Sequence, residues 1–363
     1  MAIFLPVSTI SLNLQPGKRN MNRKRILYLI GGLIFAAVII GSIIFKSFYG
    51  LKIHTGNNKI VMYIPTGSTY SQVIDSIKSK VTITDPNLFE WIAQKKNYPS
   101  HIKPGRYVID KDLSYIDLIN LLRSGRQTAV KVTFSFIRTL NDLAGKVGGQ
   151  IETDSTGIMS FLSDPENYRN DGFTKENIIS VFIPNTYEVF WNAGAEGFYR
   201  RMLKEYKNFW NDQRLAKARE KGLDPLEVAI LASIIDDEVA KPDEKPRIAG
   251  VYLNRLKRGI PLQACPTIKY AMNDFTITRV LYKHLQIESP YNTYKYKGFP
   301  PGPIGCPSVE GLDAVLNAEN HDYIFFAAKA DFSGYHNFSR TLSEHNRYAK
   351  NYQKELNKRR IFK

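Results

Sequence analysis

The sequence has few of the residues that bind transition metals or form covalent cross-links. Its 363 residues include six histidines and two cysteines, Cys265 and Cys306. Two cysteines cannot form the disulfide framework of a small secreted scaffold. The two closest histidines, His336 and His345, are nine residues apart, whereas a helical metal-binding pair has i, i+4 spacing. We therefore expect no metal centre, and nothing in the sequence indicates another cofactor.

Acidic residues are scarce relative to basic ones. The chain has 34 Asp and Glu against 50 Lys and Arg, which gives a formal net charge of +16. Such a balance favours an anionic partner, which would be nucleic acid, anionic lipid or a cell-wall polymer. Internal repeats and low-complexity segments are also lacking, and the hydrophobic content of 43% is typical of a globular protein. The composition therefore excludes a largely disordered chain but does not choose among these partners.

One long segment has no charged residue at all. Residues 26–45, ILYLIGGLIFAAVIIGSIIF, are 20 residues long, which is the length needed to cross a bilayer. Five basic residues precede this segment: Lys18, Arg19, Arg23, Lys24 and Arg25. By the positive-inside rule, residues 1–25 are then cytoplasmic, with either Met1 or Met21 as the start. We predict an uncleaved, single-pass transmembrane helix with the rest of the chain exported, which argues against nucleic acid as a partner. The alternative is a fully buried helix of a soluble protein.

The remaining sequence divides into segments of different character. Residues 46–56 form a polar linker, and residues 57–128 alternate between short strand patterns and capped helices, as in a small α+β domain. Residues 129–154 form a bridge with one strand and one helix. Residues 155–363 are mostly helical with loops rich in Pro and Gly, and they include a long helical pattern with a basic face at residues 192–220. The predicted fold class is therefore α+β.

The most informative segment is an apolar helix with clear start signals. Asp224 is a suitable N-cap, Pro225 fits the first helical position, and Glu227 completes a capping box. Residues 226–235 contain two polar residues, so this helix should be buried. Three acids follow: Asp236, Asp237 and Glu238. A Lys-Pro pair shortly after them is expected to end the helix.

The three acids stand where carboxylates are electrostatically disfavoured. The C-terminal end of a helix carries partial negative charge, and partial burial and neighbouring acids act in the same direction. All three effects raise the pKa of a carboxylic acid, which is the property that a general acid needs near neutral pH. Consecutive helical residues are about 100° apart, so the acids cannot converge on one metal ion. The alternative is that they merely form ion pairs with Lys241, Lys245 and Arg247.

Several motifs follow the acids in a characteristic order. They are EKPRIAGVYLNRLKRGIPLQACPTIKYAM at residues 244–272, SPYNTYKYKGFPPGPIGCPS at residues 289–308, and YHNFSRTLSEHNRYAKNY at residues 335–352. This ordered set resembles the MltG/YceG-like family of endolytic murein transglycosylases. The corresponding family patterns include A-S-I-[IV]-E-K-E, N-R-L, L-Q-[ST]-D-P-T, Y-N-T-Y and P-P-G. The resemblance covers almost the whole chain from residue 22.

The resemblance implies a bacterial enzyme anchored in the cytoplasmic membrane, with a LysM-like domain at residues 57–128 and a catalytic domain with a loop-rich saccharide groove at residues 155–363. Such an enzyme would cut β-1,4 bonds between N-acetylmuramic acid and N-acetylglucosamine in peptidoglycan and leave 1,6-anhydromuramic ends. It would limit glycan strand length beside peptidoglycan synthases. The family's catalytic glutamate corresponds to Glu238, which would act as general acid and then as base. The alternatives are a non-catalytic, membrane-anchored peptidoglycan-binding scaffold and a muramidase that uses water.

Other motif positions are expected to line the saccharide groove. They are Asp236, Gln263, Asn292, Tyr294, Pro301, His345 and Asn346. Amide and phenol side chains suit hydrogen bonding to sugars and ring stacking. The alternatives are turn formation and loop packing for the PPGPI segment, and helix capping for His345 and Asn346.

The chain departs from the family patterns at three places. Cys265 stands where L-Q-x-D-P-T has aspartate, Asp237 replaces the lysine of E-K-E, and SFIRTL at residues 135–140 replaces an E-G pair. The change at Asp237 should raise the pKa of Glu238 further. Because Cys306 follows the PPGPI loop, a disulfide between Cys265 and Cys306 would tie two groove loops together. Two unpaired, packed thiols are the alternative.

Overall fold

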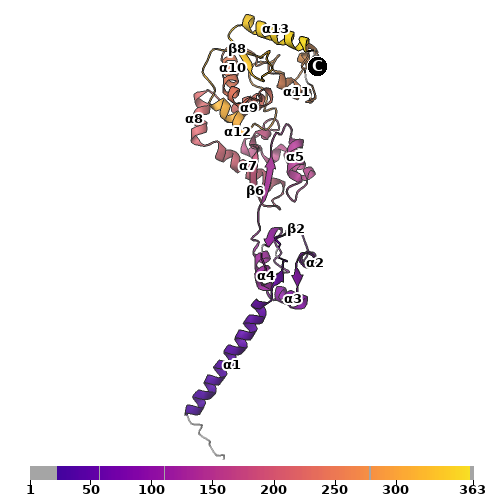
Figure 1. Cartoon of the computed structure of the whole chain (residues 1–363), viewed down its shortest axis with the longest axis vertical. Helices are drawn as coiled ribbons and strands as arrows, with labels where there is room; N and C mark the ends of the chain where they lie inside the picture. The colour runs from indigo at the N-terminus through magenta and orange to yellow at the C-terminus, as the bar shows by residue number, and fades with distance from the viewer. Residues whose placement is uncertain (1–22, 57, 110, 278, 360–363) are drawn as a thin grey trace, which may run out of the picture. The chain divides into compact units, whose positions relative to one another are not determined.

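The structure, a computed structural model, describes residues 23–359 apart from residues 57, 110 and 278 (Figure 1). For residues 23 and 25 and residues 43–49 it describes the backbone alone. The chain forms two compact units. The smaller unit comprises Met1–Ile60, Thr69–Ile102 and Ile109–Ser124, and the larger unit comprises Val61–Ser68, Lys103–Val108 and Gly125–Lys363. Helices and strands occur in both units, so the predicted α+β class is confirmed.

The smaller unit consists of helices and one short sheet. Its elements are α1 (Arg23–Gly50), β1 (Ile53–His54), α2 (Tyr70–Lys80), β3 (Thr82–Ile83), α3 (Pro86–Lys95) and α4 (Tyr115–Ser124). Strands β1 and β3 pair in antiparallel fashion. The side chains of Thr69 and Asp85 cap α2 and α3 by accepting hydrogen bonds from the backbone N–H groups of Gln72 and Leu88. The Asp85 cap agrees with the capped helices predicted between residues 57 and 128, and the Thr69 cap was not predicted.

Helix α1 covers the segment predicted to span the membrane. Its described apolar side chains between residues 26 and 42 are exposed. Within the part of the chain that the structure describes, no helix is both long and apolar enough to cross a membrane. The side chains of residues 43–45, at the end of the predicted span, lie outside the described residues, as do residues 1–22, which hold most of the predicted cytoplasmic segment.

The larger unit has two hydrophobic cores. The first core surrounds two antiparallel strands, β5 (Val130–Phe134) and β6 (Asn185–Val189), in which Val132 lies opposite Tyr187. Apolar side chains from three helices pack against this sheet: α5 (Leu140–Gly148), α6 (Ser155–Ser163) and α7 (Gly194–Phe209). Strands β2 (Ile60–Ile64) and β4 (Gly105–Ile109) also pair, and most of their residues fall in the larger unit.

The second core is built around the predicted apolar helix, α9 (Pro225–Glu238). All eight residues from Val228 to Ile235 are buried, and Asp224 and Glu227 form the predicted capping box. Four helices contact α9: α8 (Asp212–Glu220), α10 (Lys245–Lys257), α11 (Cys265–Ala271) and α12 (Val309–Leu316). Strands β7 (Phe325–Ala328) and β8 (His336–Ser339) pair with each other, and α13 (Leu342–Lys358) packs on them. Figure 1 shows α9 beside α10 and α12. Short 3₁₀ helices lie between α6 and β6 at Pro165–Asn167, Arg169–Asp171 and Ile178–Val181, and in the second core's part of the chain at Pro242–Glu244 and Tyr282–Gln286.

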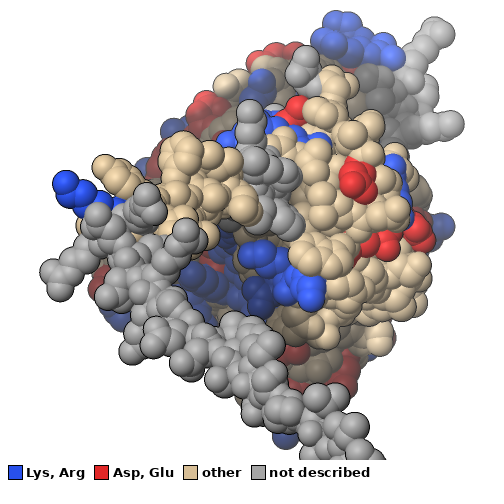
Figure 2. All heavy atoms as spheres, turned by 90° about the horizontal axis from the view of Figure 1, so that it is seen from below, with Lys and Arg blue, Asp and Glu red and all other residues tan. Residues whose placement is uncertain are grey.

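The long helical pattern predicted at residues 192–220 is two helices, α7 and α8. The break falls at Asn211, whose side chain caps α8 by accepting a hydrogen bond from the backbone of Arg214. Several of the basic residues here form ion pairs, as Arg200 does with Asp171 and Arg214 with Asp313. Lys and Arg side chains also lie among acidic and uncharged ones on the face shown in Figure 2. The basic face of this segment is therefore partly neutralised within the fold.

Candidate active site

Glu238 is the last residue of α9 and is partly buried. Burial raises the pKa of its carboxyl from 4.5 to about 7, and the charge of Asp237 acts in the same direction, against a smaller lowering by Lys269. This is the direction that the sequence predicts. Among the described residues, no side chain donates a hydrogen bond to the Glu238 carboxyl. At neutral pH this group therefore exists in both protonation states and can give or accept a proton.

Residues from three separate segments surround the Glu238 carboxyl. Its charge raises the pKa of Tyr252 on α10, of Cys265 on α11 and of Tyr294 on the following loop, although burial is the larger cause in each case. The Cys265 thiol and the Tyr294 hydroxyl are 3.2 Å apart and share a hydrogen bond. Tyr294 therefore lies near the acid, and its predicted contact with the saccharide stays a prediction. Cys265, which stands at the family's aspartate position, is also beside it.

The two other acids at the end of α9 point to different partners. Asp237 accepts a hydrogen bond from Arg138 Nη2 at 2.7 Å. Asp236 accepts from Lys245 Nζ at 2.8 Å, and from the backbone N–H and the hydroxyl of Ser308 at 2.7 and 2.8 Å. The predicted divergence of the three acids is confirmed, and ion pairing accounts for Asp236 and Asp237 but not for Glu238.

Asp236 holds three elements together, which differs from the saccharide contact predicted for it. Lys245, which is almost fully buried, bridges Asp236 to Glu310 at 3.0 Å. These two carboxylates raise the pKa of the Lys245 ammonium despite the opposing effect of burial. Ser308 caps α12 by accepting a hydrogen bond from Gly311 N–H, and it donates its own proton to Asp236. The Asp236 carboxylate therefore fixes the end of α9 to α10 and α12.

Asn292 has a structural role within its own loop, which differs from the sugar contact predicted for it. The residue is completely buried. Its amide nitrogen donates to the carbonyls of Leu285 and Ile287 at 2.9 and 2.8 Å, and its amide oxygen accepts from the backbone N–H of Tyr294 at 3.0 Å. The side chain closes its own loop and thereby sets the position of Tyr294.

The loop at residues 292–294 is joined to the segment before α11. Thr293 O accepts a hydrogen bond from the backbone N–H of Gln263, and Thr293 Oγ1 accepts from Ala264 N–H, both at 3.0 Å. Gln263 is exposed, has a φ of 55°, and accepts a hydrogen bond from Arg255 through its side-chain oxygen. Gln263 is thus at the surface near the site, although part of its hydrogen-bonding capacity is used internally.

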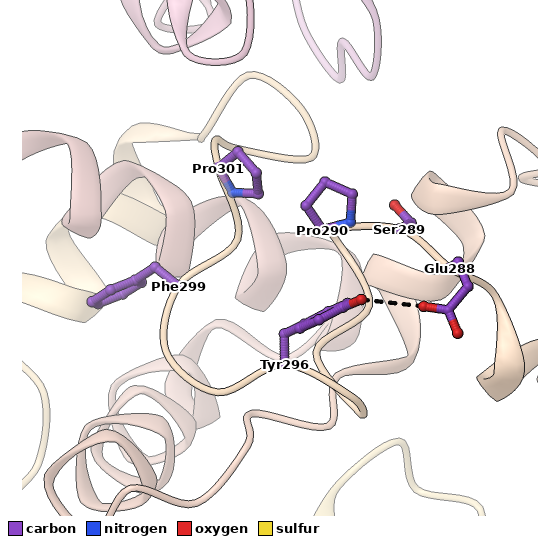
Figure 3. A pocket seen from close by; sticks show the side chains of 6 residues that line it. All are labelled: Glu288, Ser289, Pro290, Tyr296, Phe299 and Pro301. Atoms are coloured by element: carbon purple, nitrogen blue, oxygen red, sulfur yellow. Dashed lines mark hydrogen bonds between the residues drawn. The ribbon is translucent and has the colours of Figure 1, made fainter.

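Pro301 lines an open pocket of about 600 Å³ (Figure 3). The other lining residues are Glu288, Ser289, Pro290, Tyr296 and Phe299. Figure 3 shows the Tyr296 hydroxyl directed at the Glu288 carboxylate, with a separation of 3.1 Å. The neighbouring Gly302 packs so closely that a Cβ atom would lie 2.0 Å from the carbonyl oxygen of Glu176. The PPGPI segment therefore combines a hollowed surface at Pro301 with tight loop packing at Gly302.

His345 and Asn346 lie on α13 and do not cap it. The cap is Thr341, which forms a capping box with Glu344, so the capping alternative is wrong. The His345 ring stacks on Phe325 with 5.2 Å between centroids, and burial, together with Arg255, lowers the pKa of the imidazole. Asn346 lines a separate hollow along α13. The structure shows no contact of either residue with Glu238 among those it describes.

The predicted disulfide between Cys265 and Cys306 is absent, and both residues are free thiols. Cys265 is bonded to Tyr294, whereas Cys306 is buried in the first core with its backbone N–H donating to Ile137 O at 2.8 Å. Burial raises the pKa of both thiols, which disfavours the reactive thiolate. Both thiols are therefore protonated, and they pack in different places: Cys265 against Tyr294, and Cys306 in the first core.

Sequence reasoning missed the residues that position the site from a distance. Arg138 forms a hydrogen-bonded ion pair with Asp237, which is 99 positions away in the sequence. Arg255 donates hydrogen bonds to the side-chain oxygen of Gln263 and to the carbonyls of Pro261 and Ile324. The departure of residues 135–140 from the family pattern was a signal for Arg138. Arg255 is the arginine of the N-R-L motif, so a signal was present in the sequence although no role was predicted from it.

The raised pKa of Glu238 predicts an unusual dependence of stability on pH. The folded protein binds this proton more tightly than the unfolded chain, so the stability that this one group contributes is fullest below pH 4.5 and is lost as the pH rises towards 7. At about 1.4 kcal/mol per pKa unit, and allowing for water at this partly exposed group, the loss is about 2 kcal/mol. In Glu238→Gln this loss should vanish. Denaturant unfolding of both proteins at several pH values measures it, and parallel pH profiles would contradict the assignment.

The protein has an α+β fold. In its larger unit, Glu238 lies at the end of the buried helix α9 and can give or accept a proton. The sequence model of the YceG-like family matches residues 62–351. The chain therefore belongs to the YceG-like family.

Two relatives and one solved structure extend this assignment. The chain is 28% identical over 314 residues to the endolytic murein transglycosylase of Bacillus subtilis, covering 82% of this chain and 85% of the relative. It is 26% identical over 338 residues to that of Streptococcus pneumoniae, covering 83% of this chain but 61% of the relative. It also resembles the crystal structure of a YceG-like protein from Listeria monocytogenes with a TM-score of 0.52 and 26% identity, covering 80% and 98% of the two chains.

Proposed function

We propose that the protein is an endolytic murein transglycosylase that cleaves the β-1,4 bond between N-acetylmuramic acid and N-acetylglucosamine. The observation that carries the proposal is the Glu238 carboxyl, with a pKa of about 7 and no internal hydrogen-bond donor among the described residues. The names of the relatives from Bacillus subtilis and Streptococcus pneumoniae support the same activity.

Glu238 acts first as an acid and then as a base. In its protonated form it gives a proton to the glycosidic oxygen, which leaves as the 4-hydroxyl of N-acetylglucosamine. The resulting carboxylate takes the proton of the 6-hydroxyl of the muramoyl residue, whose oxygen bonds to C1 and closes a 1,6-anhydro ring. The proton balance closes without water, because Glu238 ends the cycle protonated. A pKa near 7 suits a group that must work in both directions.

The arrangement of the other acids supports a mechanism with one carboxyl group. Ordinary glycosidases place a second carboxylate across the scissile bond as nucleophile or base. Here the two nearest candidates are engaged, Asp236 by Lys245 and Ser308, and Asp237 by Arg138. Neither carboxylate is free to attack the sugar, which leaves the substrate's own hydroxyl as the acceptor.

The setting of this activity is also proposed. Residues 26–45 would anchor the chain in the bacterial cytoplasmic membrane, with residues 57–128 as a LysM-like domain and residues 155–363 acting on nascent strands beside peptidoglycan synthases. The charge-free length of the segment and the basic residues before it support the anchor. Alkaline carbonate extraction should leave the full-length chain with the membrane. Release into the soluble fraction would contradict the anchor.

The strand-length distribution of digested peptidoglycan tests the activity. An endolytic enzyme should shorten long glycan strands to intermediate lengths before small fragments accumulate, which size-resolved chromatography of the released strands would show. Release of disaccharides from the outset would contradict internal cutting. Unchanged strands that still bind the protein would favour the non-catalytic scaffold.

A further inference from the structure

Phe136 combines two properties that rarely occur together. Its φ is 50°, in the left-handed region that strongly disfavours a bulky side chain, and 67% of its surface is exposed. An exposed ring gains little from burial that would offset such strain. Residues held in this way concentrate at binding and catalytic sites, because the surrounding structure imposes the conformation for a functional reason.

The residues on both sides of Phe136 are fixed in place. Phe134 and Ile137 are buried in the first core. The carbonyl of Ser135 accepts a hydrogen bond from Lys146, and the carbonyl of Ile137 accepts one from Cys306 N–H at 2.8 Å. The ring of Phe136 is therefore turned outward by a backbone anchored before and after it.

Arg138 supports this ring from within the protein. Its guanidinium lies 4.9 Å from the centroid of the Phe136 ring and 4.8 Å from that of Phe275, so it contacts both aromatic rings. The same guanidinium forms the ion pair with Asp237, the residue before Glu238. Phe136, Arg138, Asp237 and Phe275 also border a common small cleft of about 40 Å³. The ring is thus tied by direct contacts to the residue next to the proposed acid.

We infer that Phe136, supported by Arg138, is a stacking surface for a sugar ring of the glycan strand that passes over Glu238. The inference rests on the proposed function and adds a binding subsite to it. A pyranose ring has an apolar C–H face that can cover an exposed aromatic ring and gain the free energy of its burial. The occupant is a sugar adjacent to the cleaved bond, because the strand must continue past Glu238 in both directions for an internal cut.

This subsite also accounts for two departures from the family patterns together. The E-G pair is replaced by a segment carrying Phe136 and Arg138, and the lysine of E-K-E is replaced by Asp237. These replacements contact each other through the ion pair between Arg138 and Asp237. In this chain the acid of the pair lies on α9 and the base on the segment before α5.

The test is the substitution Phe136→Gly in the full-length protein. Glycine removes the ring and adopts a φ of 50° without strain, so the melting temperature should be unchanged or higher. With purified uncrosslinked glycan strands as the ligand, binding by Phe136→Gly in a Glu238→Gln background should be about tenfold weaker. In the active protein KM should rise by the same factor with little change in kcat. Phe136→Tyr, which keeps the ring, should restore both.

Phe190→Gly is the matched control, because Phe190 is another exposed ring of the larger unit, with 54% of its surface accessible. It should leave binding and KM unchanged. Equal KM values for wild type and Phe136→Gly, or a loss that Phe136→Tyr does not restore, would overturn the stacking surface while leaving the proposed activity intact. If wild type neither bound nor cut the strands, the proposed function itself would fail, and the subsite with it.

Discussion

Replacing Glu238 by glutamine should reduce glycan cleavage by about a thousandfold while leaving glycan binding intact. General acid–base catalysis contributes roughly 10²- to 10⁴-fold, and here a single group is asked to serve in both steps. Glutamine keeps the shape of the side chain but cannot exchange a proton. Single-turnover cleavage of purified strands, with strand binding measured in parallel, separates the two effects.

Glu227→Gln provides the control on the same helix. Glu227 closes the capping box at the start of α9 by accepting from the backbone N–H of Asp224 at 2.9 Å, and glutamine can make the same bond. The control should cleave at the wild-type rate. If Glu238→Gln retained that rate, or if both variants lost it equally, the end of α9 would not hold the acid.

Replacing Lys245 by methionine should destabilise the larger unit by about 3 kcal/mol, towards the lower end of the range for breaking a buried ion pair. The side chain of Lys245 is 8% exposed and joins Asp236 to Glu310. Methionine fills the space of the aliphatic stem but leaves the Asp236 carboxylate with Ser308 as its remaining partner. The expected loss of stability lies at the lower end because Ser308 still donates two hydrogen bonds to Asp236 and because Glu310 is largely exposed.

The midpoint of denaturant unfolding, followed by tryptophan fluorescence of the whole chain, measures this loss. Lys217→Met is the control, since Lys217 is a half-buried lysine outside the Asp236 network, whose ammonium donates a hydrogen bond to Asn317 at 2.6 Å. Its effect should stay within about 0.5 kcal/mol. Equal midpoints for wild type and Lys245→Met would show that the network around Asp236 does not hold α9, α10 and α12 together.

The elements that the sequence predicts well are those whose signals are local. The N-cap, the proline and the capping box of helix α9 fall within four consecutive residues at its start. The apolar residues that follow predict that the helix is buried in a core. The end of that helix fixes the position of Glu238 and the direction of its pKa. Helix geometry alone also implies that the three acids diverge.

The parts that the sequence does not predict depend on contacts between distant segments. Asn292 fits sugar binding and loop closure equally well until the carbonyls of Leu285 and Ile287 are found beside its amide. The disulfide was a geometric hypothesis about two loops, and Cys306 instead belongs to the first core. The ion pair between Arg138 and Asp237 depends on how the segment between β5 and α5 meets the end of α9, which no local pattern specifies.

The central claim, that Glu238 transfers protons between two sugar oxygens without a water acceptor, is tested most directly by the isotopic composition of the cut ends. The full-length protein would digest purified strands in water enriched in the heavy oxygen isotope, and mass spectrometry would compare the new muramic ends with those made in ordinary water. If Glu238 transfers the protons directly, the new muramic ends should each be lighter than a reducing end by the mass of one water and should contain no heavy oxygen. Reducing ends that each contain one heavy oxygen atom would contradict it and identify a hydrolase.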